Sequence, residues 1–289
     1  MLARERYNQL VTDRRQFLDK AVDCSELTLP YLIQDDTTSK PTHETLRIPW
    51  QSVGSKCVVG LAAKLMLAIL PPQGTFFKLQ VREDKLGEEL NNPQIKGELD
   101  LSFSKIEKMI MDYIAASNDR VTIHQALKHL IAGGNSLVFM SKNGLKNYPL
   151  SRYVVNRDGN GNVLEIVTKE LISRKVLEYD IPEEPGPNTG IDESTNKEKD
   201  DVEVYTYVKL IDGQWVWHQE AFGKILPGSR STAPKNASPW LPLRFNVVDG
   251  EDYGRGRVEE FLGDLKTLEG LSQALVEGSA AAAKVIFLV

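Results

Sequence analysis

The sequence predicts an α+β protein in which helices pack on antiparallel hairpins, followed by a long helix near its C-terminal end. Three observations lead to this prediction. Apolar residues recur at helical spacing in several blocks before residue 133. Short alternating segments, some joined by Asp-Gly and Asn-Gly pairs, fill residues 136–222. Another helical stripe then begins near residue 258 and continues into a run of alanines.

The first two helices are marked by apolar stripes and by the prolines that follow them. Residues 7–22 carry the first stripe, which fades before Pro30. Residues 51–70 carry the second, and Pro71 stops it because proline lacks the amide donor and clashes with the preceding turn. Glycine and alanine in this second helix would let another backbone approach closely. Residues 76–81 alternate briefly and predict a strand.

A third helical block covers residues 96–132. Asn118 breaks it into two stripes, and Gly133 with Gly134 ends it. Two histidines in the second stripe are five residues apart, which is a poor spacing for a metal site on a helix. We interpret His124 as a core residue and His129 as a solvated one.

The next region is predicted to be rich in strands. Residues 136–141 are expected to form a buried strand, and residues 153–155 pair with 163–167 across a loop of Asp, Gly and Asn. Residues 202–211 and 215–222 form a second hairpin around Asp-Gly. Its alternating aromatic residues should form stabilising pairs across the two strands; they are Tyr205, Tyr207, Trp215 and Trp217.

Composition excludes several classes of protein. Hydrophobic residues make up 41% and charged residues 26% of the 289 positions, as in ordinary globular proteins. The formal net charge of −5 does not indicate a protein that grips nucleic acid. Residues 183–201 are rich in carboxylates and poor in apolar side chains, so we expect a mobile surface loop there. Neither a signal peptide nor a membrane span is expected.

The residues do not form a recognisable catalytic or cofactor-binding motif, so we predict no enzyme activity, no cofactor and no metal. Cys24 and Cys57 lie on apolar stripes and are expected to be buried. The residue-based alternative is a metal-dependent nuclease or other hydrolase, which would use the acidic cluster of Asp249, Glu251 and Asp252.

Four stretches, taken in order, resemble the portal (head-to-tail connector) proteins of short-tailed bacteriophages, the podoviruses. The first comprises PWQSVG at 49–54 and GLAAKLMLA at 60–68, and the second comprises RVT at 120–122 through GN at 134–135. The third comprises SRYVVNRD at 151–158 with GNVL at 161–164, and the fourth comprises DYGR at 252–255, EEFLGDL at 259–265, LE at 268–269 and KVI at 284–286. No single stretch is diagnostic, but the ordered set covers nearly the whole chain.

The resemblance implies a portal-type wing domain at residues 1–252, which would include the acidic loop. Residues 253–289 would be the first stem helix and the start of the clip. The clip proper, second stem helix, tunnel loop and crown have no counterpart in this sequence, and the apolar residues 285–289 would be a strand entering the clip.

The implied role is that of a subunit in a ring, usually of twelve copies, at one vertex of the virion. Such a ring is the conduit for DNA packaging and ejection. The partners implied are further copies of the chain, the capsid and scaffolding proteins, the terminase large subunit, the tail adaptor, internal core proteins and double-stranded DNA in transit, without sequence specificity. Assembly would take place in the cytoplasm of the bacterial host.

The subunit interface or channel is expected on the C-terminal helix. The candidate residues are its polar positions and two glycines, namely Asp264, Lys266, Glu269, Gly270, Gln273, Glu277, Gly278 and Lys284. On periodicity alone, an alanine-rich helix buried within its own domain is the simpler interpretation, and the resemblance favours contacts between subunits. A tail adaptor or capsid-binding module is a further alternative.

Overall fold

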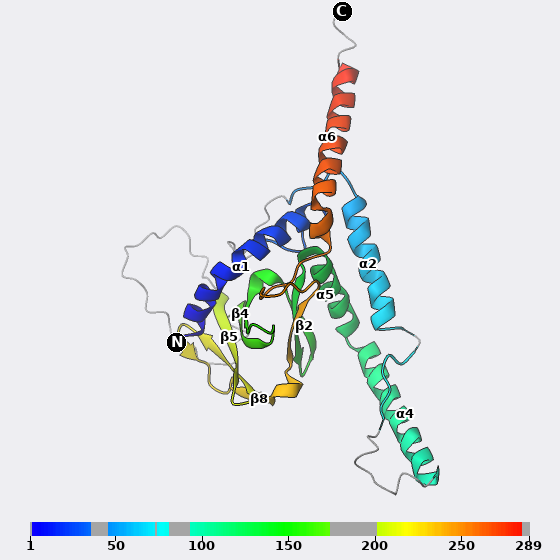
Figure 1. Ribbon diagram of the computed structural model, residues 1–289, viewed down its shortest axis with the longest axis vertical. Coiled ribbons are helices and arrows are strands. Elements are labelled where there is room, and N and C mark those ends of the chain that lie inside the picture. The colour runs from blue at the N-terminus through cyan, green and yellow to red at the C-terminus, as the bar shows by residue number, and fades with distance from the viewer. Residues whose placement is uncertain (1, 36–45, 73, 81–92, 174–200, 285–289) are drawn as a thin grey trace, which may run out of the picture.

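The computed structural model (Figure 1) describes residues 2–35, 46–72, 74–80, 93–173 and 201–284. Two sheets and the helices α1 and α5 form a compact body, and three other helices stand at its edge. Helix α4 projects from one end of the molecule and α6 from the other. The predicted mobile loop at 183–201 falls almost wholly outside the described residues, as do residues 285–289.

The predicted helices are confirmed. They are α1 (Ala3–Glu26), α2 (Val53–Ile69), α4 (Pro93–Ala116), α5 (Asp119–Gly133) and α6 (Leu262–Lys284). Helix α5 ends at Gly134, which has a φ of 75° and so takes the left-handed conformation that glycine tolerates best. None of the helices in the described ranges is long and apolar enough to cross a membrane.

The strands form two antiparallel sheets. The small sheet has the order β2-β1-β9 and contains β1 (Asn135–Ser141), β2 (Gly144–Tyr148) and β9 (Trp240–Arg244). The large sheet has the order β3-β4-β5-β6-β7, and β8 also pairs with β6. Its strands are β3 (Tyr153–Arg157), β4 (Val163–Ser173), β5 (Asp201–Ile211), β6 (Gln214–Ala221), β7 (Lys224–Ile225) and β8 (Ser231–Pro234). Short 3-10 turns lie at η2 (Leu150–Arg152), η3 (Lys235–Ala237) and η4 (Val258–Phe261).

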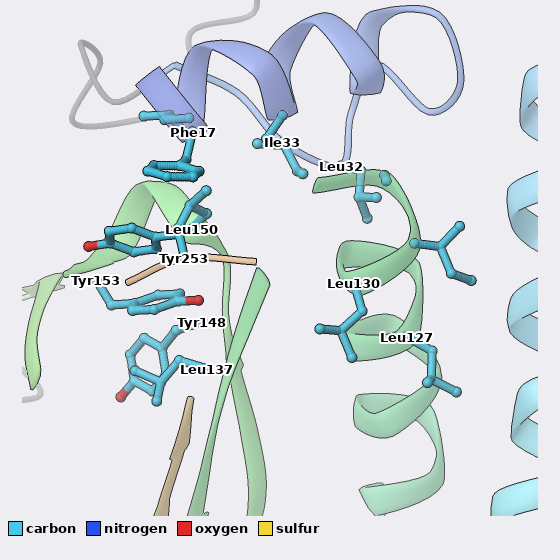
Figure 2. Packing of buried hydrophobic residues seen from close by; sticks show 14 of the residues in the cluster. Phe17, Leu32, Ile33, Leu127, Leu130, Leu137, Tyr148, Leu150, Tyr153 and Tyr253 are labelled. Atoms are coloured by element: carbon cyan, nitrogen blue, oxygen red, sulfur yellow. The ribbon is translucent and has the colours of Figure 1, made fainter. Parts of the chain in front are cut away.

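The large sheet is buried on both faces, as the alternation of its side chains requires. On one face Val154 and Val167 pack under the first half of α1. On the other face Val155 and Ile166 join the main core, with residues of α5 and the small sheet. Figure 2 shows part of this core, where Phe17 of α1 lies against Tyr253 at a ring separation of 5.2 Å.

Two predictions about the strand region are wrong. In the second hairpin Trp215 lies opposite Leu210, while Tyr207 lies opposite His218. The tryptophans and tyrosines therefore occupy opposite faces of the sheet and do not pair with one another, and the ring of Tyr207 instead meets that of His218 at a centroid separation of 5.9 Å. Residues 76–80 form no strand either, since the amide of Leu79 donates to the Glu107 side chain of α4 at 2.6 Å.

The burial of the histidines and cysteines also differs from the sequence-based interpretation. His129 is buried and His124 is only half-buried, because the C-terminal half of α5 is enclosed by α1, α2 and the small sheet and has no solvent face. Cys24 is buried as expected, but Cys57 is exposed. Helix α2 buries only the face of Gly54, Val58 and Ala62, and Cys57 lies off that face.

Candidate functional site

The base of α6 is fixed where residues 133–135 pack against residues 253–256, and we call this buried contact the joint. Asn135 receives a hydrogen bond from the Gly254 amide at 2.7 Å, and its side-chain amide donates to the Gly254 carbonyl at 2.7 Å. A Cβ atom on Gly134 would lie 2.5 Å from the Gly256 amide nitrogen, so only glycine fits there. The joint therefore sets where the chain enters η4 and α6.

Tyr253 completes this joint. Its side chain is fully buried, and its hydroxyl accepts a hydrogen bond from the Val155 amide at 3.0 Å. Burial raises the pKa of the Tyr253 phenol above its ordinary value, so the hydroxyl stays protonated. The sequence indicated Tyr253 at the start of the terminal segment, but not that Asn135, more than a hundred residues earlier, would bond to the neighbouring Gly254.

The first half of α6 is anchored by Glu269. This carboxylate is only 4% exposed and accepts the Trp50 backbone amide at 3.0 and 3.1 Å through its two oxygens. Arg47 lies 3.7 Å from one of these oxygens. A second link is the ion pair of Lys266 with Asp23 of α1, at 3.0 Å. Among the predicted site residues at 264–278, Glu269 is thus the one buried within its own subunit.

The far half of α6 stands free of the body (Figure 1), although it carries large apolar side chains. Leu271 is 65% exposed and Leu275 is 72% exposed. A stripe of small residues runs beside them along the exposed face, and we call it the small-residue stripe. Its members are Gly263, Thr267, Gly270, Ala274, Gly278 and Ala281. A Cβ atom on any of its three glycines would meet nothing within 4 Å.

Most of the polar candidates lie on a different line along α6, about a quarter-turn around the helix from the small-residue stripe. Lys266, Gln273, Glu277 and Lys284 are spaced by seven, four and seven residues, so they share one side of the helix. Gln273 donates to Glu277 at 2.8 Å. Asp264 is exposed beside the leucines. The predicted site residues therefore separate into an anchor, a polar stripe, two members of the small-residue stripe (Gly270 and Gly278), and Asp264 beside the leucines.

The acidic cluster proposed for a nuclease does not converge. Glu251 pairs with Arg255 at 2.5 Å, whereas Asp252 accepts the Arg157 amide at 3.0 Å on the edge of β3. Asp249 is exposed in the preceding turn. Across the described ranges, no group of three histidine, cysteine or acidic side chains could hold a metal ion. The hydrolase alternative has no support in this geometry.

His129 and Cys24 are buried titratable groups with strongly shifted pKa values, and Cys24 borders a small pocket beside Phe17 and Glu259. Burial lowers the pKa of His129 to about 4 and raises the pKa of the Cys24 thiol to about 12. Cys24 belongs to the main core, and His129 is buried on α5. Their shifts follow from desolvation and do not indicate a reactive centre.

The family model and the individual relatives that match this chain all describe phage connector or portal proteins. Residues 2–289 match the family described as bacteriophage head to tail connecting protein. The portal protein of Enterobacteria phage T3 is 38% identical over 99% of this chain and 54% of its own length. The portal protein of Escherichia phage T7 is 37% identical with the same coverage, and that of Enterobacteria phage SP6 is 32% identical over 96% of this chain. The chain spans about half the length of the curated relatives it matches.

Proposed function

This chain belongs to the family of bacteriophage head to tail connecting proteins, and we propose that it is a portal subunit, one of a ring of identical copies at a capsid vertex. In this proposal the ring is the conduit through which DNA enters the head and later leaves it. The relatives of known name, three of them more than 30% identical to this chain, are portal proteins. This favours a portal over a tail adaptor or a separate capsid-binding module.

The observation that carries the proposal is the exposed face of α6. Monomeric proteins rarely leave contiguous apolar surface in water, yet Leu271 and Leu275 are exposed beside the small-residue stripe. Small residues let two helix backbones approach closely. In a ring, each copy of α6 would pack beside the next, which would remove these leucines from water.

Ring geometry assigns roles to the two stripes. A closed ring uses two different surfaces of each subunit, one for each neighbour. We assign Gly270 and Gly278 to the contact between subunits. The polar stripe of Lys266, Gln273, Glu277 and Lys284 is assigned to the channel side, and Asp264, which lies beside the leucines, to the contact between subunits. Its two lysines are offset by Glu277 and by Asp23, which pairs with Lys266. The stripe would therefore bind passing DNA weakly, since phosphate affinity grows with the number of cationic contacts.

The remaining features of the proposal follow from the role of a portal. Residues 1–252 would form the wing and residues 253–289 the first stem helix with the start of the clip. The chain itself would carry no catalytic activity. The ring, of about twelve copies, would contact capsid and scaffolding proteins, the terminase large subunit, the tail adaptor and internal core proteins. It would assemble in the bacterial cytoplasm and end at the head-tail vertex of the virion.

Negative-stain imaging tests the proposal. The chain and a version extended to the length of its relatives are imaged side by side. Rings with a central hole in either sample support the portal role, and rings from the short chain alone place the main contacts in the wing and α6. Monomers in both samples would reject it.

A further inference from the structure

Helix α4 carries a second uncovered apolar face, on the side of the molecule far from α6 (Figure 1). Met109 is 70% exposed, and Tyr113 and Ile106 are also exposed. Together with their neighbours at helical spacing they form one continuous line over five turns, which we call the α4 stripe. It consists of Ile95, Leu99, Ser102, Ile106, Met109, Ile110 and Tyr113.

The α4 stripe is free of charge even though its helix is not. Helix α4 contains three lysines and four carboxylates, and all seven lie outside the stripe. A helix that only faces solvent would show charged residues all round. The pattern therefore indicates that this side of α4 is covered in the working protein.

Helix α2 offers a surface that complements it. The buried side of α2 faces α5, and its outward face carries Val53, Val59, Gly60, Ala63 and the 60%-exposed Leu67. Gly60 and Ala63 leave low ground between the larger side chains of this face, so large side chains of the α4 stripe could fit the grooves of α2. The lengths also match, at about 27 Å for the stripe and about 25 Å for α2.

Charge supports the same pairing. The only charged residues of α2 are Lys56 and Lys64, both exposed on or beside its outward face. Helix α4 has an excess of carboxylate, with Glu98 and Asp112 near the border of the stripe and Lys105 between them. Opposite net charges on two surfaces favour their association and disfavour pairing of like with like.

We propose that the α4 stripe of one subunit packs on the outward face of α2 in the next copy of this chain. The inference rests on the proposed ring and adds a second contact to that of α6. Because the two faces differ, the contact is head-to-tail and can close a ring. Residues 81–92 of the same chain are a poor alternative cover, since six of these twelve residues are charged and only Val81, Leu86 and Leu90 are apolar.

The chain is suited to a cross-linking test. Cys57 is exposed on α2, while Cys24 is buried and its thiol, with a pKa raised to about 12, remains protonated at neutral pH. Ser102 and Ser104 are both exposed on α4 and point to opposite sides of it, because two residues turn a helix by about 200°. Ser102→Cys places a thiol in the α4 stripe, and Ser104→Cys is the matched control.

Each variant is made in the chain extended to the length of its relatives, treated with a short bis-maleimide, and run on a denaturing gel. The Ser102→Cys variant should give a ladder of covalent oligomers that extends beyond the dimer, and the Ser104→Cys variant should remain monomeric. The same samples are imaged for rings. Rings without a ladder would overturn this contact and leave the portal role intact. Absence of both would overturn both. A ladder that stops at the dimer, or equal ladders from the two variants, would also reject the contact.

Discussion

Asn135 shows how one side chain can set the position of a distant helix. It is 2% exposed and uses both ends of its amide to hold Gly254, while its amide nitrogen also donates to the Gly133 carbonyl at 3.0 Å. A buried polar group that loses its partner keeps the cost of leaving water. The joint at the base of α6 is therefore sensitive to this residue in a way that its exposed neighbours are not.

We expect Asn135→Ala to lower the free energy of unfolding by roughly 1–3 kcal/mol for each buried backbone group that it leaves unpaired. Chemical denaturation of the two proteins measures the difference. Asn143→Ala is the control, because Asn143 lies exposed at the tip of the β1–β2 turn and should change stability by less than about 0.5 kcal/mol. Equal midpoints for Asn135→Ala and the parent protein would contradict the role given to the joint.

His129 makes stability depend on pH. Burial lowers its pKa from 6.5 to about 4, so the imidazole is neutral in both states at pH 7. As the pH falls from about 6.5 to about 4, the unfolded chain binds a proton that the folded protein excludes. The contribution of His129 to the free energy of unfolding is therefore complete above pH 6.5. It is lost as the pH falls through this window, by up to about 3 kcal/mol.

The pH dependence attributed to His129 is tested by measuring the melting temperatures of the parent protein and of His129→Gln between pH 7.5 and pH 4. The variant starts less stable because it disturbs the core, but its stability should vary less across the window. If the two proteins lose stability in parallel, His129 is not the group responsible.

At the scale of elements, the base of α6 is anchored to the body of the subunit, and its far half is exposed to solvent. Leu262 and Leu265 pack against the main core, and Glu269 ties the helix to the segment before α2. Beyond this point the helix relies on its own propensity, which the alanines at 280–283 supply. The same chain thus fixes the direction of α6 and leaves its far half available to other subunits.

Replacement of Glu269 by alanine should loosen this anchor. The Trp50 amide and Arg47 would both lose their partner, and we expect a loss of roughly 1–3 kcal/mol in the free energy of unfolding. Glu277→Ala removes an exposed carboxylate from the same helix and serves as the control, with little expected change. Denaturant midpoints that rank the two variants equally would contradict the anchoring role.

At the scale of the whole molecule, the body is well packed and the helices around it are not. Helices α2, α4 and α6 lie away from the large sheet or project beyond the body (Figure 1). Apolar side chains are exposed on all three. Such a distribution is typical of a subunit whose exposed apolar faces become buried when it assembles with other subunits. Stability of the single chain and formation of the ring should therefore respond to different residues.

Gly270→Leu tests this separation. A leucine in the small-residue stripe should prevent close approach of neighbouring α6 helices and abolish rings. It should not destabilise the monomer, since a Cβ atom there meets nothing within 4 Å and leucine favours helix by about 1 kcal/mol over glycine. Gly97→Leu, at an equally open position of α4 outside its stripe, is the matched control and should leave rings intact. Imaging and thermal melts of both variants decide the outcome.

The sequence by itself determined the α+β class, the helices and the main hairpins, because the spacing of apolar residues and the turn residues act locally. It also led, through ordered stretches such as DYGR at 252–255, to the portal family that the comparisons then showed. The eight candidate residues on α6 came from the same resemblance, and their assignment to an interface or channel stays a prediction.

Only the tertiary structure decided which face of each element is covered. It exchanged the environments of His124 and His129, placed the aromatic residues of β5 and β6 on opposite faces, and joined Asn135 to Gly254. These outcomes depend on contacts between residues far apart in the chain. Local patterns carry no information about such partners, since the periodicity of a helix or strand gives the direction of a face but not what lies against it.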